Sequence, residues 1–261
     1  MHSNTDNIVS KVPEITLAFW MIKILATTLG ETGGDALSMS MDLGYLVSTA
    51  IFAVIFFVAV SAQISAKSYN PTLYWVTIIA TTTVGTTLAD FADRSLGIGY
   101  AGGSTILFLL LLGSFGVWYR AQGEISSSVI SSPRTEMFYW ITIMFSQTLG
   151  TALGDWTADD AGFGYAGSSV VFGGMLLAIV AAYLWTKISR TFLFWAAFII
   201  TRPLGAVVGD FLDKPLSKGG LELSRYSASA ALLLAIAVLV FISSTRSKQN
   251  STVALDLDTD N

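Results

Sequence analysis

Four aspartates recur at one position of a repeated motif, and they are the residues of this sequence best suited to chemistry. In each copy a Trp is followed ten residues later by a Gly and five residues after that by the Asp. The four aspartates are Asp35, Asp90, Asp155 and Asp210. Carboxylate oxygens are ligands for hard cations such as Mn²⁺, Mg²⁺ or Ca²⁺, and buried carboxylates can also carry protons. We therefore take these four residues as the candidate metal ligands.

Further acids lie near the same four positions: Glu31, Asp93, Asp159 and Asp213. The sequence has no Cys and a single His, at position 2, so a metal site would have to be built from oxygen atoms. Oxygen ligands fit Cu⁺ or Zn²⁺ badly. The expected cation is therefore a hard divalent ion bound as a substrate, and no cofactor is expected.

The elements that must position these acids are apolar helices. Of the 261 residues 53% are hydrophobic and only 12% are charged, and the mean hydropathy is +0.64. About 20 apolar residues in a helix cross the roughly 30 Å of a bilayer core. Two such stretches per repeat predict an all-α integral membrane protein with eight transmembrane helices, at 13–35, 44–64, 71–92, 99–119, 135–157, 164–186, 191–212 and 224–243.

The chain is expected to have one membrane domain with short polar ends. Residues 1–12 carry no positive segment followed by an apolar one, so we expect no cleavable signal peptide. Residues 244–261 are polar and end in acids, and we expect a disordered tail there. Between them lies the eight-helix domain 13–243, composed of repeats 13–64, 71–119, 135–186 and 191–243.

Basic residues predict the orientation of the helices. Those at the ends of the repeats are Lys11, Lys67, Arg120, Arg134, Lys187, Arg190, Arg246 and Lys248, whereas the loops inside the repeats have Arg94, Lys214, Lys218 and Arg225. Because Lys and Arg are enriched in cytoplasmic loops, both termini are expected in the cytoplasm. Two crossings per repeat would make the four repeats parallel, around a pseudo-symmetry axis normal to the membrane, with the acids toward the outer face.

One face of the first helix of each repeat is polar, and we call it the polar stripe. At 100° per residue, positions 7, 8, 11, 15 and 18 after the Trp lie on this face. We expect it to turn inward as an ion or substrate pathway that includes Thr28, Thr83, Gln147, Thr148 and the acids Glu31, Asp35, Asp90, Asp93, Asp155, Asp210 and Asp213. Two other interpretations remain: the threonines could bond to their own helix, and an Asp near a helix end could cap or meet solvent.

Two basic residues lie deep in expected spans, beside the polar stripe. Lys23 precedes Glu31 by eight residues, and Arg202 precedes Asp210 by the same distance. A cation inside a membrane needs a carboxylate partner, and such pairs often belong to substrate or proton pathways. The alternative is a structural ion pair between repeats.

The repeated hairpins resemble a group of bacterial integral membrane proteins that have a tandem repeat of unknown function. The motif is Trp-x9-Gly-x4-Asp-x9-Tyr, with Tyr45, Tyr100 and Tyr165 closing the first three copies and Tyr226 following an insertion in the fourth. The resemblance covers about residues 13–243. It implies a multi-pass helical fold in the bacterial inner membrane, and it brings no catalytic or binding residues.

These observations predict a small membrane transporter for hard cations, with proton coupling as one option. The basic residues also leave room for an organic or anionic solute. The alternatives are a membrane scaffold or regulator, and an intramembrane Mg²⁺-dependent transferase that uses the acid pairs Asp90 with Asp93 and Asp210 with Asp213. We expect no enzyme, because an enzyme has little need to repeat one motif four times. The expected partners are the bilayer and a small ion or solute, without nucleic acid.

Overall fold

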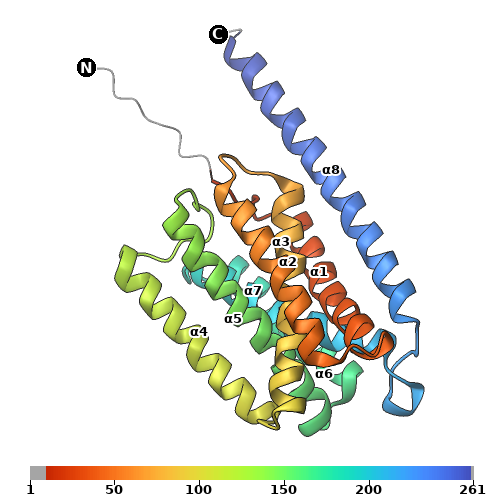
Figure 1. The fold of residues 1–261 in the computed structure, drawn as a ribbon. Coiled ribbons are helices and arrows are strands. Elements are labelled where there is room, and N and C mark those ends of the chain that lie inside the picture. Colours follow the sequence, from red (N-terminus) through yellow and green to blue (C-terminus); the bar gives the residue numbers. More distant parts are fainter. Residues whose placement is uncertain (1–9, 260–261) are drawn as a thin grey trace.

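A computed structural model describes residues 10–259, and the side chains of residues 10–245. This part of the chain is built of helices without strands (Figure 1). The α-helices are α1 (Leu17–Asp35), α2 (Gly44–Ser65), α3 (Pro71–Asp90), α4 (Tyr100–Gln122), α5 (Pro133–Asp155), α6 (Gly164–Trp185), α7 (Arg190–Asp213) and α8 (Arg225–Thr259). We call α1, α3, α5 and α7 the inner helices and the other four the outer helices.

Each inner helix begins at a side-chain cap. Thr16, Asn70, Ser132 and Ser189 each accept a hydrogen bond from the backbone N–H three residues later, which satisfies one of the free donors of the first turn. In the first three repeats the motif Asp is the last α-helical residue before a π-helical turn, η1 (Ala36–Ser40), η2 (Phe91–Ser95) and η3 (Trp156–Asp160). Such wide turns often lie at functional sites.

The inner helices form a closed ring, which the outer helices surround. Around the ring α1 packs against α3, α3 against α5, α5 against α7, and α7 against α1. Each outer helix packs on the inner helix of the following repeat: α2 on α3, α4 on α5, α6 on α7, and finally α8 on α1. The four motif aspartates and Glu31 are buried among these helices.

The repeated Gly of the motif explains how close the inner helices come. A Cβ atom at Gly30 would collide with Thr82 on α3, and one at Gly205 would lie 2.8 Å from the carbonyl carbon of Thr27 on α1. Gly85 faces Gln147 and Thr148, and Gly150 faces Arg202, in the same way. Small residues let helix backbones approach closely, so each motif Gly makes room for the polar stripe of the next repeat.

Aromatic side chains fill the ring at the end opposite the motif aspartates, and we call them the aromatic plug. Its buried members include Phe19, Tyr74, Trp75, Tyr139, Trp140, Phe194, Trp195 and Phe198. The hydroxyls of Tyr74 and Tyr139 share a hydrogen bond of 2.7 Å. Burial of large aromatic surface and edge-to-face packing stabilise this end.

Among the described residues, five helices are long and apolar enough to cross a membrane: α2, α4, α6, α7 and the part of α8 from Arg225 to Thr245. Only 11% of the apolar stretch is buried in α6 and in α8, against 67% in α7. Exposed apolar helices around a polar core are compatible with a membrane-embedded protein. The other inner helices are less hydropathic because they carry the Thr, Gln and acidic residues of the stripe.

The C-terminal end of the chain is helical over a longer stretch than expected. Helix α8 continues to Thr259, where a disordered tail was predicted over 244–261. No Gly or Pro interrupts residues 244–259, so the helix can propagate from its packed first half. Of the predicted N-terminal segment 1–12, residues 1–9, which include His2, lie outside the described residues. The side chains of Arg246 and Lys248 also lie outside them.

Candidate functional site

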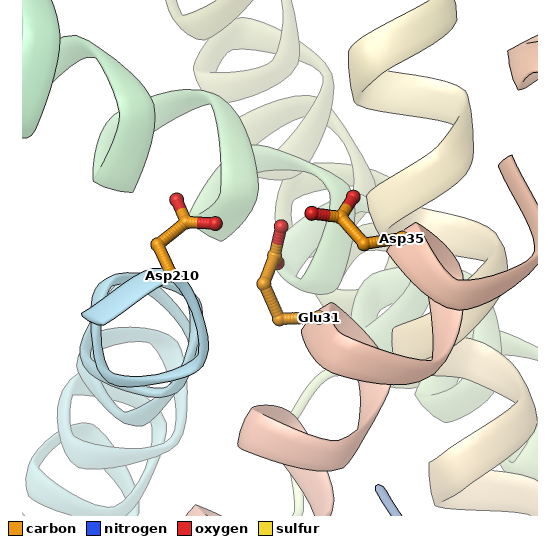
Figure 2. A group of neighbouring side chains, drawn as sticks. All are labelled: Glu31, Asp35 and Asp210. Carbon is orange, nitrogen blue, oxygen red and sulfur yellow. The ribbon is translucent and has the colours of Figure 1, made fainter. Parts of the chain in front are cut away.

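Three buried carboxylates meet where α1 and α7 end. Glu31 and Asp35 lie one turn apart on α1, and Asp210 reaches them from α7 (Figure 2). One oxygen from each residue lies within 4.8 Å of the other two. This spacing would allow a single cation to contact all three. The approach depends on Gly209, where a Cβ atom would lie 2.7 Å from the Cβ of Glu31.

Lys214 provides the positive charge for this carboxylate group. Its ammonium pairs with Asp35 and lies 2.9 Å from Asp210 Oδ1 and 4.0 Å from Asp213 Oδ1. Burial by itself lowers the pKa of Lys214, but the surrounding carboxylates of Asp210, Asp35 and Asp213 outweigh it and hold the pKa well above its ordinary value. Lys214 therefore stays charged and acts as an internal cation at this site.

The other two motif aspartates share an arginine. Arg94 Nε lies 3.0 Å from Asp90 Oδ1, and Arg94 Nη2 lies 2.9 Å from Asp155 Oδ2. The guanidinium also donates to the hydroxyl of Tyr45 at 3.2 Å and lies 5.7 Å from the ring centre of Tyr100. We call Asp35, Asp90, Asp155 and Asp210 the acid layer. Two basic side chains thus link its four members in two pairs.

Arg202 lies deeper in the ring, at the centre of a second polar layer. Its Nη2 donates to Glu31 Oε2 at 3.0 Å, to Thr86 Oγ1 at 2.5 Å and to Thr151 Oγ1. These three acceptors occupy the same motif position in the first three repeats, and the fourth repeat has Ala206 there. The carboxylate partner of Arg202 is therefore Glu31 on α1, whereas Asp210, on its own helix, pairs with Lys214.

Lys23 has a different environment from the one expected. Its Nζ lies 3.4 Å from Gln147 Oε1 and 4.1 Å from the ring centre of Phe198. Within the described residues it forms no salt bridge, so the expected carboxylate partner is replaced by an amide and an aromatic face. The cation–π contact supplies only part of the stabilisation that a carboxylate would give.

The remaining predicted residues fall into two groups. The hydroxyls of Thr28, Thr83 and Thr148 donate to the carbonyls of Ile24, Ile79 and Met144, four residues earlier, which is the helix-packing alternative. Asp213 contacts Arg225 Nε at 2.8 Å. Asp93, in η2, packs against Gly103 of α4, and burial raises its pKa to about 6 against the opposing effect of Arg94.

Sequence reasoning missed the two linking cations. Arg94 and Lys214 were assigned to loops, yet each lies four residues after a motif Asp, and their side chains turn back to that Asp. The spacing of one helical turn was the available signal. Thr86 and Thr151 lay on the polar stripe but were not singled out.

Comparison with known proteins identifies the repeat. A protein-family model described as "Repeat of Unknown Function (DUF347)" matches residues 18–69, 73–124, 138–189 and 193–249. The four matches follow the four helical hairpins and cover most of the chain, which confirms the resemblance seen in the motif. No match was found among curated proteins or among solved structures.

Proposed function

The chain belongs to the DUF347 repeat family, and from its buried charges we propose that it is a small membrane transporter for hard divalent cations such as Mn²⁺ or Mg²⁺. The observation that carries the proposal is the group formed by Glu31, Asp35 and Asp210, with ligand oxygens within 4.8 Å of one another. Cations of this class prefer carboxylate oxygen. The same carboxylates could exchange protons, which makes proton coupling part of the proposal.

The proposed membrane arrangement has eight spans, as four parallel two-helix repeats around an axis normal to the membrane. The closed ring of inner helices and its apolar outer helices support it. An even number of crossings would put both termini on one side, and the distribution of basic residues favours the cytoplasm of a bacterial inner membrane. The acid layer would then face outward and the aromatic plug inward.

In this mechanism the bound cation exchanges with the protein's own charges. Lys214 neutralises Asp35 and Asp210 while no ion is bound. An arriving divalent ion would displace the ammonium and take the same oxygens, because opposite charges there must stay balanced in a buried site. Arg202 would hold Glu31 at the inner edge of the site, and the aromatic plug would keep that end closed until the ring rearranges.

Energetics favour transport over a passive scaffold. Burying ion pairs gives little net stability compared with apolar packing of similar volume. Intramembrane charges that persist are by default functional, and this ring encloses Glu31 and four motif aspartates. The transferase alternative requires the acid pairs Asp90 with Asp93 and Asp210 with Asp213 each to hold one metal ion. Asp90 instead pairs with Arg94, and Asp93 packs on Gly103. In the second pair Asp210 contacts Lys214 and Asp213 contacts Arg225.

Flux into sealed proteoliposomes tests the proposal. We expect Mn²⁺ uptake by the wild type and its loss in Asp35→Asn and Asp210→Asn, which keep side-chain size but remove a charged ligand. Asp42→Asn is the matched control, because Asp42 is exposed and has a φ of 55°, a conformation that Asn also tolerates. Absence of Mn²⁺ and Mg²⁺ flux, or full uptake by both site variants, would favour the scaffold.

A further inference from the structure

Deeper in the ring than the acid layer, Arg202 and Gln147 have buried N–H groups that lack acceptors among the described residues, and Lys23 lies beside them. Arg202 uses Nη2 for all its bonds, while its Nε and Nη1 atoms have no partner among the described residues. The Nε2 atom of Gln147 is likewise unpartnered. Lys23 has a single hydrogen bond, to Gln147. All three side chains have 0% exposure, so bulk solvent does not satisfy them.

These donors come from three helices, and Arg202 lies about one helical turn from the contact between Lys23 and Gln147. Lys23 on α1 contacts Gln147 on α5 and the ring of Phe198, which precedes Arg202 by one turn of α7. Gly150, about one turn beyond Gln147, packs directly against the side chain of Arg202. We call Lys23, Gln147 and Arg202 the donor cluster.

The donors of this layer outnumber its acceptors. Lys23 and Arg202 are the two basic groups, and Glu31 is the acid that contacts them, through Arg202 alone. A buried donor without an acceptor costs about 1–3 kcal/mol. A small group with a negative charge and several acceptor lone pairs would satisfy these donors.

We infer that the donor cluster binds a small monovalent anion, either a halide such as chloride or the carboxylate group of a small solute. Both have the shared chemistry of one negative charge that accepts several N–H bonds. Arg202 would donate from Nε and Nη1, Gln147 from Nε2, and Lys23 would supply the balancing charge. The site is of opposite sign to the acid layer, and its existence does not depend on cation transport.

Thermal unfolding of the purified protein in detergent tests the inference. Ionic strength is held constant with the sodium salt of a bulky sulfonate buffer, which is neither a halide nor a carboxylate, while chloride or acetate replaces it stepwise without divalent ions. An anion that binds the folded state raises the Tm by mass action, with saturation. A saturable rise with chloride alone identifies an inorganic ion, and a rise with acetate identifies a carboxylate site. Equal Tm values in all three salts would overturn the inference.

Two variants keep the result tied to the cluster. Lys23→Gln removes the charge, Gln147→Leu removes the amide donor, and each should weaken the anion response at least about tenfold in concentration, the equivalent of one lost charged hydrogen bond. If one variant does not fold, the other carries the test. Lys67→Gln, an exposed basic residue between α2 and α3, is the control that should respond as the wild type. An anion response unchanged in a folded cluster variant would refute the site.

Discussion

The acid layer consists of two halves that share the same acid and differ in the cation. In one half Arg94, with 28% side-chain exposure, links Asp90 and Asp155. In the other Lys214, with 9% exposure, links Asp35 and Asp210. The position four residues after the motif Asp is basic only in the second and fourth repeats, and it is Met39 and Asp159 in the others. Four similar repeats therefore produce a twofold pattern of charge.

The difference teaches which half can exchange its cation. A guanidinium is a rigid fork that fixes two carboxylates, whereas an ammonium is a compact point charge on a flexible chain. The lysine half also includes Glu31 and, through it, Arg202. We therefore regard the arginine half as a clamp and the lysine half as the place where an external ion would bind.

The largest expected effect comes from breaking the salt bridge between Arg202 and Glu31, which adjoins the lysine half. Arg202→Met should leave Glu31 buried without its cation and lower the free energy of unfolding by about 3–5 kcal/mol. Adding Glu31→Gln should restore part of this loss, which thermal unfolding in detergent can measure. If Arg202→Met were as stable as the wild type, the layer around Arg202 and Glu31 would have to be hydrated, and the salt bridge between these two residues would contribute nothing to stability.

Replacing the two linking cations compares the halves directly. Lys214→Met should cost about 1.5–3 kcal/mol, as for hydrogen bonds to charged groups, and millimolar Mn²⁺ should recover much of that by binding the freed carboxylates. Arg94→Met should cost less because Arg94 is more exposed, and it should gain no such response. Thermal unfolding with and without Mn²⁺ measures the loss of stability and its recovery, and isothermal calorimetry measures Mn²⁺ binding. Tighter Mn²⁺ binding by the Arg94 variant than by the Lys214 variant would show that the arginine half is the one that accepts an ion.

Helix packing should also differ between the halves. Gly205→Ala sets a methyl group 2.8 Å from the Thr27 carbonyl carbon, while Gly85→Ala meets the Thr148 nitrogen at 3.0 Å. Overpacking of this kind costs about 1–3 kcal/mol, and the Gly205 variant should lie at the upper end. Gly113→Ala on α4 has open space around it and should be neutral or slightly stabilising. Melting temperatures in that order would support a tighter α1–α7 contact.

The smallest effect concerns pH and Asp93, next to the arginine clamp. Because burial raises the pKa of Asp93 to about 6, the unfolded chain ionises first as the pH increases. This residue therefore lowers stability progressively between about pH 4 and pH 6, with no further loss above that range. Asp93→Asn should flatten the profile over that interval relative to the wild type. Parallel stability curves for the two proteins would show that Asp93 is solvated.

The helices and the polar stripe could be predicted from sequence because both are local properties. Apolar length and a 100° period place α1 to α7 and the start of α8 within a few residues of their observed ends, but α8 continues from its predicted end at 243 to Thr259. What could not be predicted is which helix packs on which, since the outer helix of one repeat covers the inner helix of the next. The partner of Arg202 follows from that packing: Glu31 lies on the neighbouring helix α1, whereas Asp210, eight residues after Arg202 on α7, pairs with Lys214.

The local signals also failed where one residue admitted two roles. Arg94 and Lys214 were interpreted as loop residues when the orientation of the helices was predicted. Their position four residues after a motif Asp also allows each side chain to contact that Asp across one helical turn. The environment of Lys23 had no signal at all, because Gln147 and Phe198 come from two other helices.

The contact between α8 and α1 has a consequence for biosynthesis. Every other outer helix packs on the inner helix that is made directly after it, but α8 covers the first helix of the chain. The hydrogen bond from Ser229 to Thr32 therefore joins residues that are 197 positions apart, and Arg225 contacts Asp35 beside it. While the ribosome is still translating, α1 must wait beside the growing chain with this flank uncovered. The contact with α8 can form only after the last helix is made, so we expect a chain that lacks this helix to leave that flank of α1 exposed to quality-control proteases.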